Sequence, residues 1–231
     1  MSRLSMVCLL FTLLMPIITA QGGTVNLGGG SGGNFSINVS SIMEQRFKTI
    51  YKQQYDFSCG SATLASLLAF HYEDDVDEFM VFKDMYSNGN KQKIQKNGFS
   101  LLDMKRYLFR RGYRSNGFKI SLNQLAKAEI PAITIINNKG YMHFVVIKGS
   151  NENEVLIGDP AIGIKVYSRE EFDKMWNKQI LFVIQDKKDI ASNHFQSQAE
   201  WKLRVKSNLG LALDHSSLAL FNMLQPSSID F

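Results

Sequence analysis

The pattern of apolar and polar residues changes once along the chain, near Pro131. Before that point apolar residues are spaced as in helices, and after it they form short runs separated by polar turns. Residues 59–72 hold leucine and alanine at closely spaced positions, with Leu64, Leu67 and Leu68 among them. This spacing predicts a helix, from Cys59 to about Tyr72, that is buried on most of its sides.

Three further helices are predicted from their first turns. In each, a serine is followed three positions later by an acidic or amide residue that can reach back to the serine amide. The pairs are Ser100 with Asp103, Ser121 with Gln124 and Ser168 with Glu171. Ser58 is expected to cap the helix that begins at Cys59.

After Pro131 the chain is typical of a series of strands. The apolar runs are "PAITII", "YMHFVVI", "NENEVLIGDPA", "GIKVYS" and, after the helix at Ser168, "ILFVI". Short polar turns between successive runs favour antiparallel pairing. Helices come first and the sheet second, which predicts an α+β domain with the leading helix packed on the sheet.

The two ends of the chain differ from this domain. Residues 1–20, "MSRLSMVCLLFTLLMPIITA", have one basic residue, an apolar stretch and a small residue before a plausible cleavage point, as in a secretory signal peptide. Residues 21–40 are rich in Gly, Ser and Asn and are expected to form a flexible leader. The main domain is then expected at 41–190, followed by a helical C-terminal extension at 191–231.

This order predicts an exported protein, periplasmic or secreted. No later segment is long and apolar enough to span a membrane, so no stable span is expected once the signal is removed; an uncleaved N-terminal anchor is the alternative. The "QGG" at residues 21–23 also leaves open that the chain cuts its own leader, although a plain flexible linker is favoured.

Composition and charge exclude one class of partner. The 231 residues are 45% hydrophobic, enough for one sizeable core. The formal net charge is +5, but no run reaches the five or six like charges of a nucleic-acid arm. We therefore expect no nucleic-acid partner.

Cys59 is the first candidate for chemistry. Removal of the signal peptide takes Cys8 with it, so Cys59 becomes the only thiol and no internal disulfide can form. In an exported compartment a lone thiol is buried, paired between chains or used chemically. In the first turn of a helix, the unpaired amides and the helix dipole are expected to lower the pKa of a thiol toward neutrality.

A thiol nucleophile needs a base, and His143 is the best placed of the four histidines. It lies at the start of a predicted strand, just after a turn. His71 is about three helical turns from Cys59, too far to touch it, and His194 and His215 belong to the C-terminal extension.

An aspartate and a glutamine complete the candidate set. Asp159 follows His143 by sixteen residues, at the end of the next predicted strand, where it can orient the imidazole. Gln53 lies six residues before Cys59 and can donate its amide N–H to an oxyanion, with Gln54 as the alternative. The order Gln, Cys, His, Asp is that of a papain-like thiol peptidase.

The stretches "KQQYDFSCGSATLASLL", "MHFVVI" and "IGDPAIGIKVYSREEFDKMW" resemble peptidase family C39, the peptidases that remove double-glycine leaders. The similarity covers roughly residues 46–185. It implies a papain-like α+β fold and cleavage of a polypeptide after paired glycines, and we expect neither a cofactor nor a metal. By this resemblance Gln53 is the oxyanion residue, Cys59 the nucleophile, His143 the general base and Asp159 the residue that orients it.

The sequence departs from the family pattern in three ways. Ser58 stands directly before the nucleophile, where the family usually has Asp, so less negative charge is expected beside the thiol. The transporter and ATPase portions are absent, and no P-loop pattern G-x-x-x-x-G-K-[ST] occurs. The signal peptide places the domain outside the cytosol. The resemblance therefore predicts the mechanism better than the substrate, which we expect to be another exported protein or peptide.

Two other function classes stay open. One is a C39-like module that binds a peptide without cutting it, and the other is a papain-like amidase or transglutaminase that acts on the cell envelope. The intact set of four residues argues against the first. Nothing in the sequence separates a peptidase from an amidase as sharply.

Overall fold

The computed structural model describes residues 23–28, 34–55, 57–138, 140–176 and 179–203, and the chain divides into two units between Ser41 and Ile42. In the first unit, strands β1 (Gly23–Gly28) and β2 (Asn34–Val39) pair antiparallel. No regular element was predicted here, because the high content of Gly, Ser and Asn outweighed the short alternation of Phe35, Ile37 and Val39 with polar residues. The predicted signal peptide lies outside the described residues.

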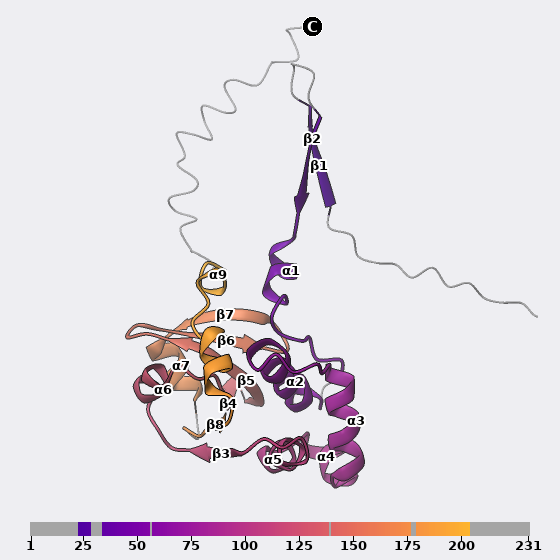
Figure 1. Cartoon of the computed structure of the whole chain (residues 1–231), viewed down its shortest axis with the longest axis vertical. Coiled ribbons are helices and arrows are strands. Elements are labelled where there is room, and N and C mark those ends of the chain that lie inside the picture. Colours follow the sequence, from indigo (N-terminus) through magenta and orange to yellow (C-terminus); the bar gives the residue numbers. More distant parts are fainter. Residues whose placement is uncertain (1–22, 29–33, 56, 139, 177–178, 204–231) are drawn as a thin grey trace, which may run out of the picture. The chain divides into compact units, whose positions relative to one another are not determined.

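Helices make up most of the first half of the second unit (Figure 1). They are α1 (Ile42–Arg46), α2 (Cys59–His71), α3 (Glu78–Asn88), α4 (Lys91–Asn97) and α5 (Leu101–Arg110), with α6 (Leu122–Ala128), α7 (Arg169–Met175), α8 (Lys188–Asn193) and α9 (Gln198–Trp201) further on. The helix at Cys59 and the three helices with capping boxes are confirmed. Helices α3 and α4 were not predicted, because their N-caps Asp77 and Asn90 lack an acidic or amide partner three residues on.

The prediction that the side chain of Ser58 caps α2 is wrong. Ser58 occupies the N-cap position, but its hydroxyl makes no capping hydrogen bond to the helix. It lies 2.7 Å from the Glu78 carboxyl at the start of α3. The hydroxyl oxygen accepts the Tyr55 N–H at 3.1 Å instead of a helix amide.

The second half forms an antiparallel sheet in the order β3-β8-β4-β5-β6-β7. Its strands are β3 (Ser115–Phe118), β4 (Ala132–Asn138), β5 (Tyr141–Ser150), β6 (Glu154–Asp159), β7 (Gly163–Ser168) and β8 (Leu181–Ile184). The predicted runs after Pro131 and their antiparallel pairing are confirmed. The sequence analysis missed β3, which is short and contains only one large apolar residue.

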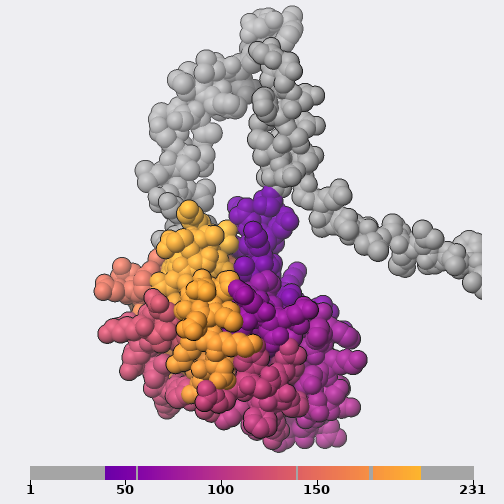
Figure 2. Space-filling model, in the orientation of Figure 1, coloured from indigo at the N-terminus to yellow at the C-terminus, as the bar shows by residue number. Residues whose placement is uncertain are grey.

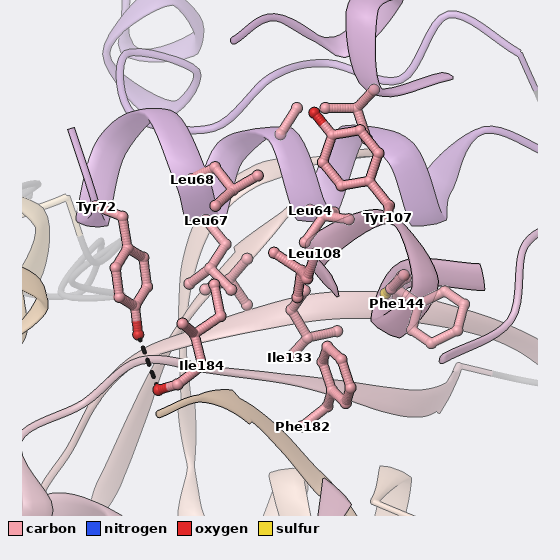
Figure 3. Close-up of a cluster of buried hydrophobic side chains, with 14 of the residues drawn as sticks. Leu64, Leu67, Leu68, Tyr72, Tyr107, Leu108, Ile133, Phe144, Phe182 and Ile184 are labelled. Atoms are coloured by element: carbon pink, nitrogen blue, oxygen red, sulfur yellow. Dashed lines mark hydrogen bonds between the residues drawn. The ribbon is translucent and has the colours of Figure 1, made fainter. Parts of the chain in front are cut away.

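Both faces of the sheet are covered, which explains why four consecutive residues of β5, 144–147, are apolar. Phe144 and Val146 pack in the cluster that holds α2, whereas Val145 and Ile147 pack in the cluster that holds α6 and α7. Figure 3 shows Leu64 and Leu67 of α2 pointing toward the sheet, and the Tyr72 hydroxyl donating to the Ile184 carbonyl oxygen at 3.3 Å. Full burial of one such leucine contributes about 1.5–3 kcal/mol. The α+β architecture with α2 on the sheet is confirmed.

The described part of the C-terminal extension packs on the domain. Figure 2 shows this segment in yellow across one face, next to the indigo residues that begin the domain. The Gln196 N–H donates to the Lys148 carbonyl oxygen at 2.8 Å, and Trp201 is buried in the same cluster as α2. Residues 204–231 lie outside the described residues. None of the helices in the described ranges combines the length and apolar character needed to cross a membrane.

Candidate active site

Cys59 is the first residue of α2 and is 8% exposed. Its turn is fixed to β5 by Thr63, whose hydroxyl lies 2.6 Å from the Cys59 carbonyl oxygen and 3.1 Å from that of Phe144. Gly60 is required by packing, since a Cβ there would lie 2.8 Å from the Phe99 Cβ. The thiol is thus held against the strand that carries His143.

Burial raises the pKa of the Cys59 thiol, opposite to the sequence prediction. Hydrogen bonds from the backbone N–H groups of Phe144 and Gly60 lower it in part, and the charge of Asp159 raises it further. Desolvation dominates because the thiolate loses more hydration than the amides replace. The free protein therefore holds Cys59 as a thiol at neutral pH, and a base must take its proton.

His143 and Asp159 form a buried pair on neighbouring strands β5 and β6. Nε2 of His143 lies 2.8 Å from Oδ2 of Asp159, and the two side chains are 3% and 2% exposed. Asp159 Oδ1 accepts the Ala161 N–H at 2.8 Å, which fixes the carboxylate. Among the residues that the structure describes, His143 Nδ1 is buried without a partner. With Nε2–H donating to the carboxylate, Nδ1 is the nitrogen free to accept a proton.

Gln53 lies beside this pair through its backbone. Its N–H donates to the Pro160 carbonyl oxygen, one residue after Asp159, at 3.1 Å. Its Nε2 donates to the Tyr55 carbonyl oxygen at 3.5 Å. The alternative, Gln54, has an exposed side chain, and its N–H points to Glu78 on α3. The contacts of the two residues favour Gln53 as the neighbour of His143 and Asp159.

The other histidines lie elsewhere. His71 is buried near the end of α2, and neither ring nitrogen has a partner within the described ranges. His194 pairs with Glu73 at 2.8 Å, on the surface. His215 and Cys8 fall outside the described residues. No cluster of three or more His, Cys, Asp or Glu suited to a metal occurs in the described part of the chain.

Glu78 is a neighbour of the site that sequence reasoning missed. It is 5% exposed and meets Ser58, the residue directly before the nucleophile. Helix α3 thus brings a carboxyl to Ser58, whereas the charge that acts on the pKa of Cys59 is that of Asp159. The acidic run "EDDVDE" at residues 73–78 gives no sign that its last member turns inward.

Comparison with known proteins agrees with this geometry. Residues 47–188 match the Peptidase C39 family. The chain is 35% identical, over 96% of its own length and 98% of the relative's, to a probable functional amyloid protease FapD of Pseudomonas fluorescens. It is 39% identical to the protein of that name in Pseudomonas aeruginosa, over 76% of this chain and 78% of the relative.

Among solved structures, a double glycine motif protease from an AMS/PCAT transporter, in complex with its leader peptide, is 28% identical. The alignment covers 58% of this chain and 89% of that protein, with a TM-score of 0.48. The family match covers more than half of the chain, and it includes all four candidate residues. The chain therefore belongs to the peptidase C39 family and is a cysteine peptidase with a papain-like α+β fold.

Proposed function

We propose that the protein is an exported endopeptidase that cleaves another exported polypeptide after small residues of the Gly-Gly type. The observation that carries this proposal is the buried His143–Asp159 pair, whose histidine lies on β5, the strand to which the first turn of α2 is hydrogen-bonded. A signal peptide at residues 1–20 would take the enzyme to the periplasm or outside the cell.

In the proposed mechanism, Nδ1 of His143 takes the proton of Cys59 as the sulfur attacks the scissile carbonyl carbon. The π-electron pair of the carbonyl moves to the oxygen. This oxyanion accepts hydrogen bonds from the side-chain amide of Gln53 and from the backbone N–H of Cys59. The tetrahedral intermediate then collapses, and imidazolium gives its proton to the leaving amine. Water, deprotonated by His143, hydrolyses the resulting thioester. Asp159 keeps Nε2 protonated and stabilises the imidazolium throughout.

The relatives suggest the substrate class. Both Pseudomonas relatives carry the name of probable functional amyloid proteases, and one of them aligns over nearly the whole chain. We therefore extend the proposal to an exported protein of a functional amyloid system as substrate. The leader segment of the enzyme itself, with "QGG" at residues 21–23, is a second possible substrate.

Incubation of the purified chain, residues 21–231, with peptides that contain Gly-Gly or Gly-Ala tests the proposal. We expect cleavage products in mass spectra for the wild type and none for Cys59→Ala. A thiol-directed probe should label the wild type only.

Labelling without peptide cleavage would favour the amidase or transglutaminase, and peptide binding without labelling or cleavage would favour the binding module. Identical N-termini in wild type and Cys59→Ala produced in cells would exclude self-processing.

A further inference from the structure

A path of hydrogen bonds runs from α3 to the side chain of Gln53, through the loop before the nucleophile. Oε1 of Glu78 lies 2.7 Å from the hydroxyl of Ser58. That hydroxyl accepts the Tyr55 N–H at 3.1 Å and lies 3.0 Å from the Tyr55 carbonyl oxygen. The same carbonyl oxygen accepts from Nε2 of Gln53 at 3.5 Å. Ser58 and Tyr55 therefore connect the carboxyl of Glu78 to the amide that we assign to the oxyanion.

The carboxyl of Glu78 also holds the loop directly. The Gln54 N–H donates to the same Oε1 at 3.4 Å. Oε2 is buried and has no partner within the described part of the chain. A buried carboxyl with an unpaired oxygen is unfavourable for folding, so stability gives no reason to place one here. Its two contacts both go to the segment between Gln53 and Cys59.

We propose that Glu78 is a positioning residue for catalysis, which holds the Gln53 amide toward the oxyanion through Ser58 and Tyr55. The inference rests on the proposed role of Gln53. The amide nitrogen has two hydrogens, and with one donated to Tyr55 the other is available to the substrate. Without Glu78, the Ser58 hydroxyl and the Gln54 N–H lose their common acceptor. The loop then samples other conformations, and fewer molecules present the amide correctly.

Kinetics of Glu78→Ala on a cleaved peptide test the proposal. We expect kcat to fall about 10-fold, less than the 100-fold or more expected from loss of an oxyanion donor, while KM changes less than about twofold. Glu78→Gln keeps an oxygen acceptor and should restore kcat to within about threefold of wild type. In a Gln53→Ala background, Glu78→Ala should have no further effect on kcat, because its target is already gone.

Asp77→Ala is the matched control. Asp77 is adjacent, exposed, and caps α3 by accepting the Met80 N–H at 2.7 Å. Its loss should weaken α3 without changing kcat. The alkylation rate of Cys59 by iodoacetamide, an assay without substrate, should stay within about twofold of wild type in Glu78→Ala, because neither of the two contacts of Glu78 reaches the thiol.

The two proposals fail separately. If the wild type cuts no peptide, the proposed function is wrong, and the role of Glu78 falls with it. If the wild type cuts peptide and Glu78→Ala has the same kcat, or if the losses in Gln53→Ala and Glu78→Ala add, only the role of Glu78 is wrong. An equal loss of kcat in Asp77→Ala would also overturn it, since the effect would then come from α3 as a whole.

Discussion

Strand β5 carries two buried ionisable side chains, His143 and Lys148, which differ in whether a hydrogen-bonding position is left without a partner. His143 uses one nitrogen on Asp159 and leaves the other without a partner among the described residues. Lys148 is also buried, but its Nζ meets three acceptors, the carbonyl and hydroxyl oxygens of Thr49 and the Glu200 carboxyl. An ammonium has three donors, so Lys148 has none left for a substrate.

By this comparison we distinguish the proposed general base, His143, from a structural lysine, Lys148. Both pairs are ionisable and buried, so burial and charge alone do not mark the active site. What marks it is an unused acceptor beside a nucleophile. The Lys148 pair instead connects the start of the domain, the sheet and the C-terminal segment, which carries Glu200 on α9.

The largest effect is expected at the catalytic end of β5, in Asp159→Asn. The amide favours the wrong imidazole tautomer and does not stabilise the imidazolium, so kcat should fall by roughly 1,000- to 10,000-fold with KM almost unchanged. Peptide kinetics at saturating substrate measure this. An effect confined to KM would show that Asp159 binds substrate instead of orienting His143.

At the other end of β5, Lys148 is paired with Glu200 of α9. Glu200→Ala should lower the free energy of unfolding and leave kcat unchanged. Removal of one partner leaves Lys148 buried and uncompensated, at a cost of about 3–5 kcal/mol in the free energy of unfolding. Urea denaturation measures the loss, and kcat per folded molecule should stay within about twofold of wild type. The double variant Lys148→Met/Glu200→Leu, which removes both charges, should recover most of the stability. A large loss of kcat in folded Glu200→Ala would break the distinction between the two ends.

Sequence could predict the catalytic end because its parts are local. His143 and Asp159 lie on consecutive strands joined by a short turn, so antiparallel pairing brings them to the same region. Cys59 is marked by the serine, glycine and buried helix around it. Each of these signals lies within a few residues or one hairpin.

The Lys148–Glu200 pair at the other end of β5, and the contact of Glu78 with the loop before Cys59, could not be predicted in this way. Lys148 reads as an ordinary lysine near the end of a strand, and its partner follows 52 residues later in a segment without a strong pattern. Glu78 ends an acidic run typical of a solvated surface, and only the packing of α3 against the loop turns it inward. The burial that raises the pKa of Cys59 likewise depends on the whole fold.

A smaller effect concerns His71, which lies near Lys148. Burial lowers its pKa well below the usual value, and the charges of Lys148 and His194 lower it further. The unfolded chain therefore binds this proton more readily, so stability is complete above pH 6.5 and falls as the pH drops below it. We expect the free energy of unfolding to decrease as the pH falls from 6.5 to 5, and His71→Phe should remove this decrease. Urea titrations of the wild type and His71→Phe at several pH values test this. Equal pH dependence in His71→Phe and wild type would contradict it.

The smallest expected effect is a displaced titration of Cys59 in the free enzyme. Because its pKa is raised, the thiol stays protonated below the ordinary thiol value of about 8.5, and thiolate appears only as the pH rises beyond it. The rate of alkylation by iodoacetamide should therefore rise mainly above neutral pH, and it should level off at a higher pH than for glutathione measured alongside. Asp159→Asn should move the midpoint down, because the negative charge of Asp159 is one cause of the raised pKa. A midpoint below that of glutathione would show instead that the free enzyme already holds a thiolate–imidazolium pair. In that case Nδ1 of His143 would already carry the proton of Cys59 before substrate binds. His143 would then differ from Lys148 less than the unpaired Nδ1 indicates.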